Sequence, residues 1–203
     1  ALARLGLDSY FLCGFSSDSY GDLERAEFLA DNVKLDLSPI LDRPSATAHV
    51  TLDDNGSASY IFTFDGTATF SELDNWLPDP SQPPAVLYTG TLGTLIEPSA
   101  SILYEWVQKV DAPIVYDINV RSSVEGNRDK YLANVVKWAA LSDVVKLSDD
   151  DASWLFPEKG HEEVGRTFLA MGVKLVVITL GADGIVGFTP HGSVRVPGVK
   201  VRS

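Results

Sequence analysis

Four short apolar runs recur along the chain at nearly equal spacing, and this rhythm constrains the fold more than any other feature. Their centres lie near residues 87, 115, 145 and 177, so successive runs are 28, 30 and 32 residues apart. Each intervening stretch has an apolar pattern of helical period, as in repeated strand–helix units. Runs rich in Val and Ile suit strands buried on both faces. The sequence therefore predicts a three-layer α/β/α, Rossmann-like domain whose sheet is mainly parallel.

The stretches between the runs predict helices with recognisable ends. Helical spacing of apolar residues places these helices over 22–30, from Pro98 onward, over 129–140, between Ser148 and Pro157, and over 162–171. In the 129–140 helix the residues expected to face inward are Tyr131, Leu132, Val135, Val136 and Ala139. Near the N-terminus, residues 1–5 are expected to end a helix capped by Gly6, and residues 9–15 to form a strand.

Residues 45–66 depart from this rhythm. The stretches 47–52 and 57–64 alternate between apolar and polar residues, and Asn55-Gly56 lies between them, which is a strong signal for a β-hairpin. Tyr60, Phe62 and Phe64 share one face of the second strand, together with Ala58. We interpret this hairpin as a lid or a dimer interface; the alternative is that its strands extend the main sheet.

Composition excludes several classes of partner. The chain of 203 residues has a net charge of −12, which argues against nucleic acid or an anionic membrane as a ligand. No apolar stretch reaches the roughly 18 residues that a membrane-spanning helix needs. A single cysteine, Cys13, rules out an internal disulfide and fits a reducing compartment, so a cytoplasmic location is expected. The length of the chain fits one domain over 1–203.

Polar residues follow the apolar runs at the places where the strands should end. Asn119 and Arg121 follow the second run, Ser148 and Asp151 follow the third, and a Gly181-x-x-Gly184 loop follows Thr179 after the fourth. Because the carboxyl ends of parallel strands meet at one edge of a sheet, these residues are expected to line a common ligand site.

The chemistry of these residues has a plain interpretation beside the functional one. Ser148-x-x-Asp151 is first of all a capping box that begins a helix. A helix N-terminus with Lys146 nearby is also suited to phosphate, and Asp151 to a hydrated Mg²⁺. Arg121 is either a solvated surface charge or a ligand for a phosphate or sugar oxygen.

Several common catalytic motifs are absent from the sequence. It has no Gly-x-Gly-x-x-Gly that opens a helix and no phosphate-loop signature ending in Lys-Ser or Lys-Thr. It also lacks a Gly-x-Ser-x-Gly elbow, a Cys/His cluster for zinc, and a pair of histidines close in sequence. These absences argue against a classical dinucleotide enzyme, a P-loop enzyme, a serine hydrolase of the elbow type and a zinc enzyme.

Six patterns occur in one order along nearly the whole chain. They are Ala3-Arg-Leu-Gly6, Asp18-x-x-Gly21, the 47–64 hairpin, Asp117-Ile-Asn119-Val-Arg121, Val145-Lys-Leu-Ser-Asp-Asp-Asp151 and Thr179-Leu-Gly181-x-x-Gly184. Together they resemble the motifs of the ribokinase-like (PfkB-type) carbohydrate kinases, and within these the fructokinase-like branch. Ile118 stands where that family has Pro, and Ser148 and Asp151 stand in place of the Asn and Glu of its Asn-x-x-Glu motif.

The resemblance implies transfer of the γ-phosphoryl group of ATP to a sugar hydroxyl, with fructose as the first expectation. It implies a homodimer joined through the lid, and Mg²⁺ and K⁺ as ions. The implied ATP-binding residues are Lys146, Ser148, Thr179, Gly181 and Gly184, with Mg²⁺ held through water by Asp151. The implied sugar-side residues are Asn119, Arg121, Thr47 and Phe64.

Two parts of the family pattern have no counterpart among these residues. The sugar-binding Asp and Gly-Gly would precede Ala1, and the Gly-Ala-Gly-Asp motif, which carries the general base, would follow Ser203. We therefore expect no catalytic base within the 203 residues, and no sugar-dependent ATP turnover by them alone. Alternatives left open are a kinase for ribose, adenosine or a 2-keto-3-deoxy sugar acid, and a non-catalytic sugar-sensing protein.

Overall fold

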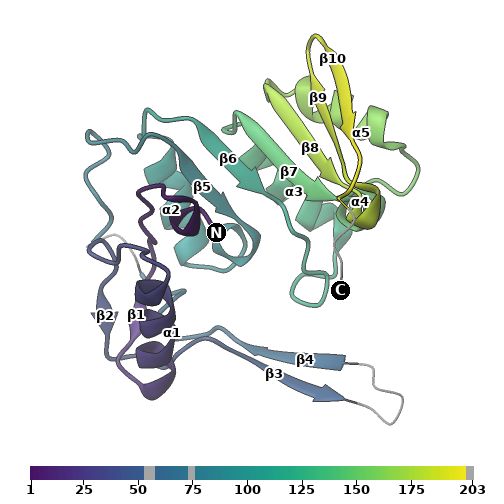
Figure 1. The fold of residues 1–203 in the computed structure, drawn as a ribbon. Helices are drawn as coiled ribbons and strands as arrows, with labels where there is room; N and C mark the ends of the chain where they lie inside the picture. The colour runs from purple at the N-terminus through teal and green to yellow at the C-terminus, as the bar shows by residue number, and fades with distance from the viewer. Residues whose placement is uncertain (53–57, 73–75, 200–203) are drawn as a thin grey trace. The chain divides into compact units, whose positions relative to one another are not determined.

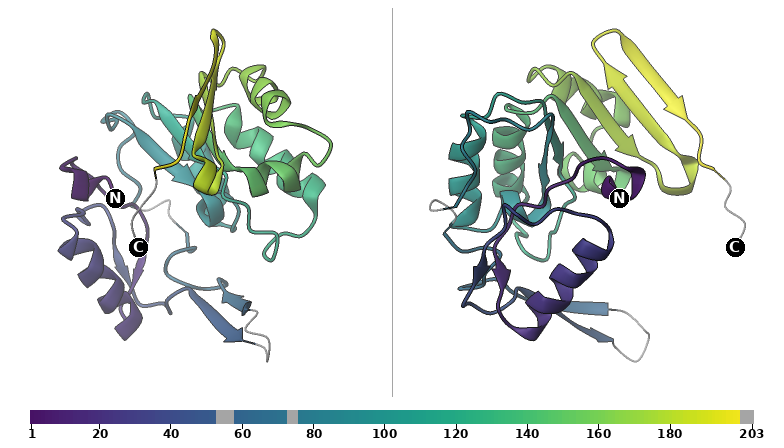
Figure 2. Two further views of the ribbon diagram at one scale, coloured as in Figure 1. Left: turned by 45° about the vertical axis from the view of Figure 1, so that its right-hand side comes forward. Right: turned by 60° about the vertical axis from the view of Figure 1, so that its left-hand side comes forward.

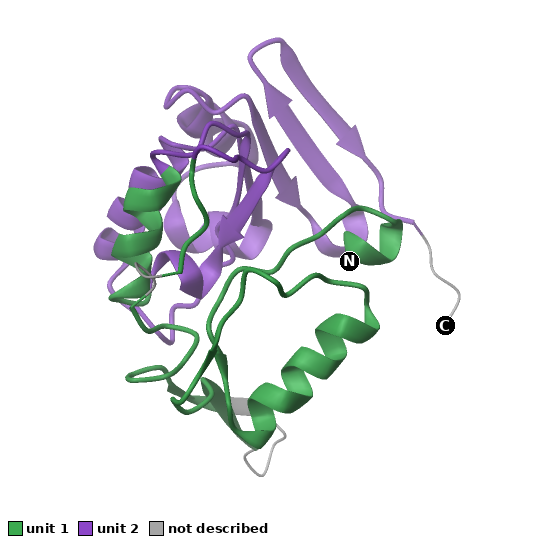
Figure 3. Cartoon of the chain, turned by 90° about the vertical axis from the view of Figure 1, so that its left-hand side faces the viewer, with its two compact units in different colours: residues 1–80, 96–107 green, residues 81–95, 108–203 purple. Residues whose placement is uncertain are grey.

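A computed structural model of the chain describes residues 1–52, 58–72 and 76–199. The chain forms two compact units, coloured separately in Figure 3. Unit 1 contains residues 1–80 and 96–107, and unit 2 contains residues 81–95 and 108–203. The predicted Asn-Gly turn of the hairpin lies outside the described residues. Within the described part of the chain, no helix is long and apolar enough to span a membrane.

Unit 2 is built on a six-stranded sheet with the order β10-β9-β8-β7-β6-β5 (Figure 1). The four strands predicted from the apolar runs are all present and parallel, and each contains the predicted centre of its run. Two antiparallel strands complete the sheet, with β10, in yellow, at its outer edge, as the right-hand view of Figure 2 shows. The strands are β5 (Leu87–Gly90), β6 (Ile114–Asp117), β7 (Val144–Ser148), β8 (Leu175–Thr179), β9 (Ile185–Thr189) and β10 (Gly192–Val196).

The helices of unit 2 confirm the predicted rhythm. They are α3 (Arg128–Ala139), α4 (Asp149–Leu155) and α5 (His161–Leu169). Four side chains of β7 and β8 are fully buried in the core: Val145, Leu147, Val176 and Ile178. Helix α4 contacts both strands, and α5 contacts β8. Helix α5 approaches β9 closely, since a Cβ at Gly165 would lie 2.6 Å from the Phe188 ring.

The expected inward face of α3 is wrong at one position. Val136 is 38% exposed, whereas Trp138 is buried. The buried stripe runs through Tyr131, Val135, Trp138 and Ala139, which is the spacing of one helix face, and Val136 lies one step off it. Trp138 also donates its indole N–H to the Thr94 carbonyl oxygen at 3.1 Å, which gives this polar group a partner inside the core.

Unit 1 contains the N-terminal elements and the hairpin. Its elements are β1 (Phe15–Ser16), α1 (Ser19–Ala30), β2 (Ile40–Leu41), β3 (Thr47–Leu52), β4 (Ala58–Thr63) and α2 (Ser99–Val107), with a 3-10 helix at Ala3–Leu5. Gly6 ends this short helix with φ 85°, as predicted. Strands β1 and β2 pair in parallel, and α1 begins three residues earlier than expected.

The predicted strand over residues 9–15 is wrong except at its end. Only Phe15 and Ser16 have strand geometry, together with a single bridge between Tyr10 and Lys34. Between these points the Ser38 hydroxyl donates to the Phe11 carbonyl at 2.6 Å and accepts from the Cys13 N–H at 3.3 Å. A side chain therefore satisfies the backbone groups that a neighbouring strand would otherwise pair.

The predicted hairpin is confirmed. Strands β3 and β4 form an antiparallel sheet of their own, so the alternative in which they extend the main sheet is wrong. The ribbon projects from the rest of unit 1 (Figure 1). Its aromatic residues stack in a row along one face, with ring centroids 6.0 Å apart for Tyr60 and Phe62 and 5.3 Å for Phe62 and Phe64. The row ends at Phe70, whose buried ring meets Phe64 edge-on at 5.1 Å.

Candidate strand-edge site

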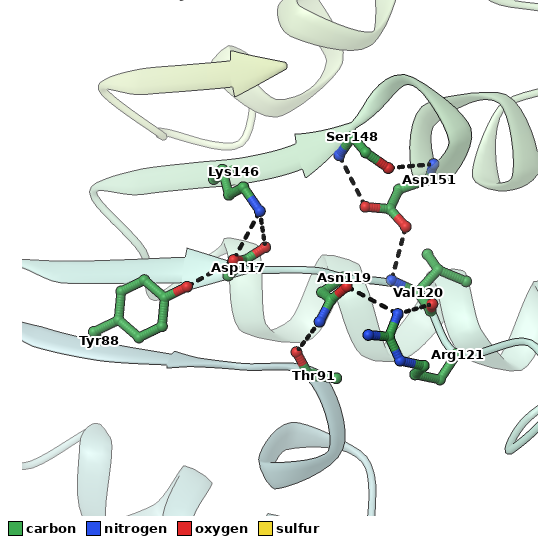
Figure 4. A network of polar contacts seen from close by, with 9 residues as sticks. All are labelled: Tyr88, Thr91, Asp117, Asn119, Val120, Arg121, Lys146, Ser148 and Asp151. Atoms are coloured by element: carbon green, nitrogen blue, oxygen red, sulfur yellow. Dashed lines mark hydrogen bonds and ion pairs between the residues drawn. The ribbon is translucent and has the colours of Figure 1, made fainter. Parts of the chain in front are cut away.

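The carboxyl ends of the parallel strands bring most of the predicted site residues to one edge of unit 2. Gly90 pairs with Asp117, and Asp117 with Lys146, while Ser148 of β7 lies beside Thr179 of β8. The loops that follow these strands therefore leave the sheet side by side, as the sequence predicted. Figure 4 shows the polar network that results.

An ion pair dominates the middle of this network. The Lys146 ammonium contacts both carboxylate oxygens of Asp117, at 2.9 and 3.0 Å, and the Tyr88 hydroxyl donates to the same carboxylate at 2.6 Å (Figure 4). Partial burial of the phenol, together with the Asp117 hydrogen bond and charge, raises the pKa of Tyr88. The lysine predicted to meet phosphate is thus already neutralised by a carboxylate. A phosphate group would have to share this lysine with Asp117.

A second chain of contacts joins the ends of β5 and β6. The Asn119 amide donates to the Thr91 hydroxyl at 2.9 Å, and the Arg121 guanidinium donates to the Asn119 side-chain oxygen at 2.9 Å. Asn119 and Thr91 both have positive φ, 40° and 49°, which is uncommon outside glycine. Strained backbone of this kind concentrates at functional sites. Asn119 and Arg121 are brought together as predicted, and Thr91 joins them.

Thr91 was not among the site residues predicted from the sequence. The signal was the Thr-Gly-Thr sequence directly after the first apolar run. Gly90, within it, has extended backbone, and a Cβ there would collide with the Asp117 carbonyl oxygen. The glycine lets β5 lie tightly against β6 just before the chain turns at Thr91. A threonine after a glycine at a strand end is too common a pattern to mark a site residue by itself.

The capping box at the start of α4 is complete. The Ser148 hydroxyl accepts the Asp151 N–H at 3.0 Å, and Asp151 accepts the Ser148 N–H at 2.8 Å. The other carboxylate oxygen of the buried Asp151 accepts the Val120 N–H at 2.8 Å, which ties α4 to the loop after β6. This arrangement is the plain interpretation of the Ser148-x-x-Asp151 pattern.

The metal prediction for Asp151 can be weighed against these bonds. Both oxygens already accept a backbone N–H, so direct coordination of Mg²⁺ would compete with the contacts that hold α4 in place. Contact through water fits this geometry better. Among the described residues, no group of three or more His, Cys, Asp or Glu side chains is arranged to hold a metal ion.

The loop after β8 requires its two glycines for different reasons. Gly181 has φ 55° and open space where a Cβ would stand. Gly184 has φ 94°, and a Cβ there would collide with the Val196 carbonyl oxygen of the strand that returns beside it. The Leu180 N–H bonds to the Gly184 carbonyl at 2.8 Å and closes the loop. Gly181 therefore has room for a ligand, whereas Gly184 is constrained by the chain itself.

Thr47 and Phe64, the remaining predicted site residues, belong to the hairpin of unit 1. Thr47 begins β3 and pairs with Thr63. Phe64 directly follows Thr63 in sequence, so its side chain lies on the face opposite to that of Thr47 and Thr63, where its ring stacks on Phe62. The structure places these two residues on different faces of the hairpin, and only Phe64 belongs to the aromatic row.

Comparisons with known proteins extend over the whole chain. A family profile described as "pfkB family carbohydrate kinase" matches residues 1–203. The chain is 33% identical over 203 residues to the fructokinase of Rhizobium leguminosarum bv. trifolii, covering 99% of this chain and 62% of the relative. It is 26% identical over 205 residues to the aminoimidazole riboside kinase of Salmonella typhimurium, covering 98% and 64%.

Solved structures agree on the fold. A fructokinase from Xylella fastidiosa with bound ATP matches with a TM-score of 0.87 at 22% identity, covering 99% of this chain and 64% of the other. A fructokinase from Vibrio cholerae O395, crystallised with fructose, ADP and calcium, matches with a TM-score of 0.84 at 24% identity, covering 99% and 66%. The predicted three-layer α/β fold is thereby confirmed. The chain spans somewhat less than two thirds of the length of the curated relatives above.

Proposed function

Because this chain belongs to the pfkB family of carbohydrate kinases, we propose that it forms the core of an enzyme that phosphorylates fructose with ATP. The observation that carries the proposal is the strand-edge network of Figure 4, where a lysine, an arginine and a helix N-terminus gather. Phosphoryl transfer depends mainly on positioning and on compensation of negative charge. Arg121 is suited to this compensation, whereas Lys146 would share its charge between the phosphate and Asp117. Fructose is favoured because a fructokinase is 33% identical over nearly the whole chain.

Each predicted site residue has a role in this proposal. Arg121 and Asn119 bind the sugar or the transferred phosphoryl group, and Phe64 and Thr47 belong to the lid that covers the sugar. Asp151 would hold Mg²⁺ through water, and K⁺ is a further ion to test. The nucleotide-side residues are Lys146, Ser148, Thr179, Gly181 and Gly184.

A related kinase activity is the second candidate. The similarity to an aminoimidazole riboside kinase, at 26% identity, favours a nucleoside-like acceptor as the alternative to fructose. Ribose, adenosine and 2-keto-3-deoxy sugar acids complete the set of acceptors to compare. A non-catalytic sugar-sensing protein of the same fold is the alternative from another class.

A kinase assay on the full-length protein that carries this chain tests the proposal. We expect ATP-dependent phosphorylation of fructose, with kcat/KM at least about tenfold above that of ribose, adenosine and aminoimidazole riboside, a difference of about 1.4 kcal/mol. ADP release, coupled to NADH oxidation, is the measurement. Preference for another acceptor would move the assignment to that kinase, and binding of sugar without turnover would favour the sensing protein.

The variant Arg121→Ala tests the site directly. Its guanidinium contacts Asn119 and the Val120 carbonyl at an exposed strand end, so its removal leaves the core intact. We expect kcat/KM to fall by about 30-fold, or about 2 kcal/mol, because a charge-assisted contact is lost. Arg128→Ala, at the start of α3, is the matched control. Equal activity of the two variants would return Arg121 to the role of a solvated surface charge.

The hairpin is proposed to join two subunits in the cytoplasm. Tyr60 at its outer part is more than half exposed, and a two-stranded ribbon is marginal by itself. Packing of the aromatic row of one subunit against that of another would cover the exposed rings of both hairpins. We expect sedimentation velocity to show a dimer at micromolar concentration that Phe62→Ser weakens, and a monomeric full-length protein would contradict this proposal.

A further inference from the structure

One carboxylate in unit 1 connects two segments that are distant in sequence. Asp18 caps α1 by accepting the N–H groups of Tyr20 and Gly21 at 3.0 and 2.9 Å. The same carboxylate accepts the Ser45 N–H at 2.9 Å and the Ser45 hydroxyl at 2.7 Å. Ser45 lies two residues before β3, so Asp18 links the first turn of α1 to the base of the hairpin.

The backbone around Asp18 is itself well held. The hydroxyl of the buried Ser16 donates to the Arg43 carbonyl at 2.6 Å and accepts the Asp18 N–H at 3.0 Å. A Cβ at Gly21 would collide with the Ser16 carbonyl oxygen, so the helix begins in tight contact with the end of β1. The Asp18-x-x-Gly21 pattern is thus explained: the aspartate makes the bonds, and the glycine permits the close approach.

The hairpin is held at its base on both strands. On the side of β3, the Ser17 N–H donates to the Leu41 carbonyl at 3.0 Å, and nearer to the strand Asp18 accepts the Ser45 N–H. On the returning side the Ala68 N–H bonds to the Pro44 carbonyl at 2.9 Å. Beyond Ser45, the backbone of β3 pairs with β4. The direction in which the hairpin projects from the rest of unit 1 is therefore set next to Ser45.

We propose that Asp18 is a positioning residue for the hairpin, which fixes the base of β3 against α1 and so determines where the aromatic row stands. The hydrogen bonds from Gly21 and Ser45 also lower the pKa of Asp18, so the carboxylate stays ionised and keeps accepting all four bonds at neutral pH. The consequence for sugar binding rests on the proposed function, in which the hairpin covers the sugar.

Asp18→Asn separates the two tasks of this side chain. Asparagine caps a helix about as well as aspartate, so its oxygen keeps the Tyr20 and Gly21 contacts. Its amide nitrogen, a donor, would then face the Ser45 N–H, which is also a donor. We expect hydrogen exchange, resolved by NMR in the full-length protein, to become at least about tenfold faster at Ser45 and to stay unchanged at Tyr20 and Gly21.

Two further variants make the result decisive. Asp18→Ala removes both tasks, and it should accelerate exchange at Tyr20 and Gly21 as well as at Ser45. Ser45→Ala removes one bond from the hairpin side without touching the α1 cap. It should accelerate exchange at the amide of residue 45 alone. Unchanged exchange at residue 45 in both Asp18→Asn and Ser45→Ala would overturn the proposal.

A kinetic measurement distinguishes this inference from the proposed function. If the hairpin covers the sugar, Asp18→Asn and Ser45→Ala should raise KM for the sugar by about threefold or more, with KM for ATP unchanged. A purely structural loss would alter both constants together. Faster Ser45 exchange without any change in KM for the sugar would confirm the anchoring role of Asp18 and contradict the role of the hairpin as a sugar cover.

Discussion

Replacing Gly184 by alanine is expected to lower the free energy of unfolding by about 4 kcal/mol, because two unfavourable terms add. The backbone at Gly184 has φ 94° and ψ −132°, a region that residues with a Cβ avoid. The new methyl group would also collide with the Val196 carbonyl oxygen and with backbone atoms of Pro197 and Gly198. Backbone cannot move aside as a flexible side chain does. The strand beside the loop would have to shift.

Gly181→Ala is the matched control for this prediction. It lies three residues earlier in the same loop, has φ 55°, and leaves a Cβ in open space. Only the conformational term applies, so a loss of about 1 kcal/mol is expected. Urea unfolding followed by circular dichroism measures both variants without reference to ATP. Similar losses for the two would show that the crowding beside Gly184 relaxes easily. Reduced ATP affinity of Gly181→Ala at nearly normal stability would support its proposed place beside the nucleotide.

Lys146→Met should destabilise the protein by about 3 kcal/mol, because it leaves the Asp117 carboxylate inside unit 2 without its cation. The Asp117 side chain is only 13% exposed, whereas that of Lys146 is 36% exposed. The partial exposure of the lysine keeps the expected loss at the lower end for buried pairs. The Tyr88 hydroxyl still donates to Asp117 in this variant, but it carries no charge to balance the carboxylate.

The double variant Lys146→Met/Asp117→Asn shows whether the loss comes from the unpaired charge. An amide in place of the carboxylate removes the charge and keeps an oxygen for the Tyr88 hydroxyl, so stability should recover to within about 1 kcal/mol of the parent protein. Denaturant unfolding of the two single variants and the double variant completes the cycle. A double variant as unstable as Lys146→Met would show that the lysine acts through its packing. Kinase activity should stay low in both if Lys146 also binds phosphate.

The sequence predicted the parallel sheet because its signal is local and repeated. Each of the four runs carries enough Val, Ile and Leu to mark a strand without knowledge of its neighbours, and equal spacing then implies parallel order. The strand-edge residues Asn119, Arg121, Ser148 and Asp151 followed from that order. Their positions in the sequence fix them to the ends of neighbouring strands, whatever the loops between them do.

What the sequence did not predict depends on contacts between distant residues. Tyr88 is 57% exposed and looks like a surface residue, and only the position of Asp117 on the neighbouring strand gives its hydroxyl a partner. The false strand over 9–15 was apolar enough, but Ser38 occupies the backbone groups that pairing would need. Lys146 was identified as a cation near phosphate. Its carboxylate partner could be recognised only once β6 and β7 were placed in register.

Helix α2 has a practical consequence for anyone who divides this chain by cloning or proteolysis. Its residues lie between two segments of unit 2, yet it belongs to unit 1, where the Trp106 indole donates to the Pro78 carbonyl at 2.7 Å. A gene fragment that stops near residue 80 would encode unit 1 without this helix, and a fragment that begins there would carry the helix as an unpaired apolar segment. Within these 203 residues, neither side of such a cut therefore encodes a complete compact unit. The two peptides should regain structure only when produced together, by fragment complementation.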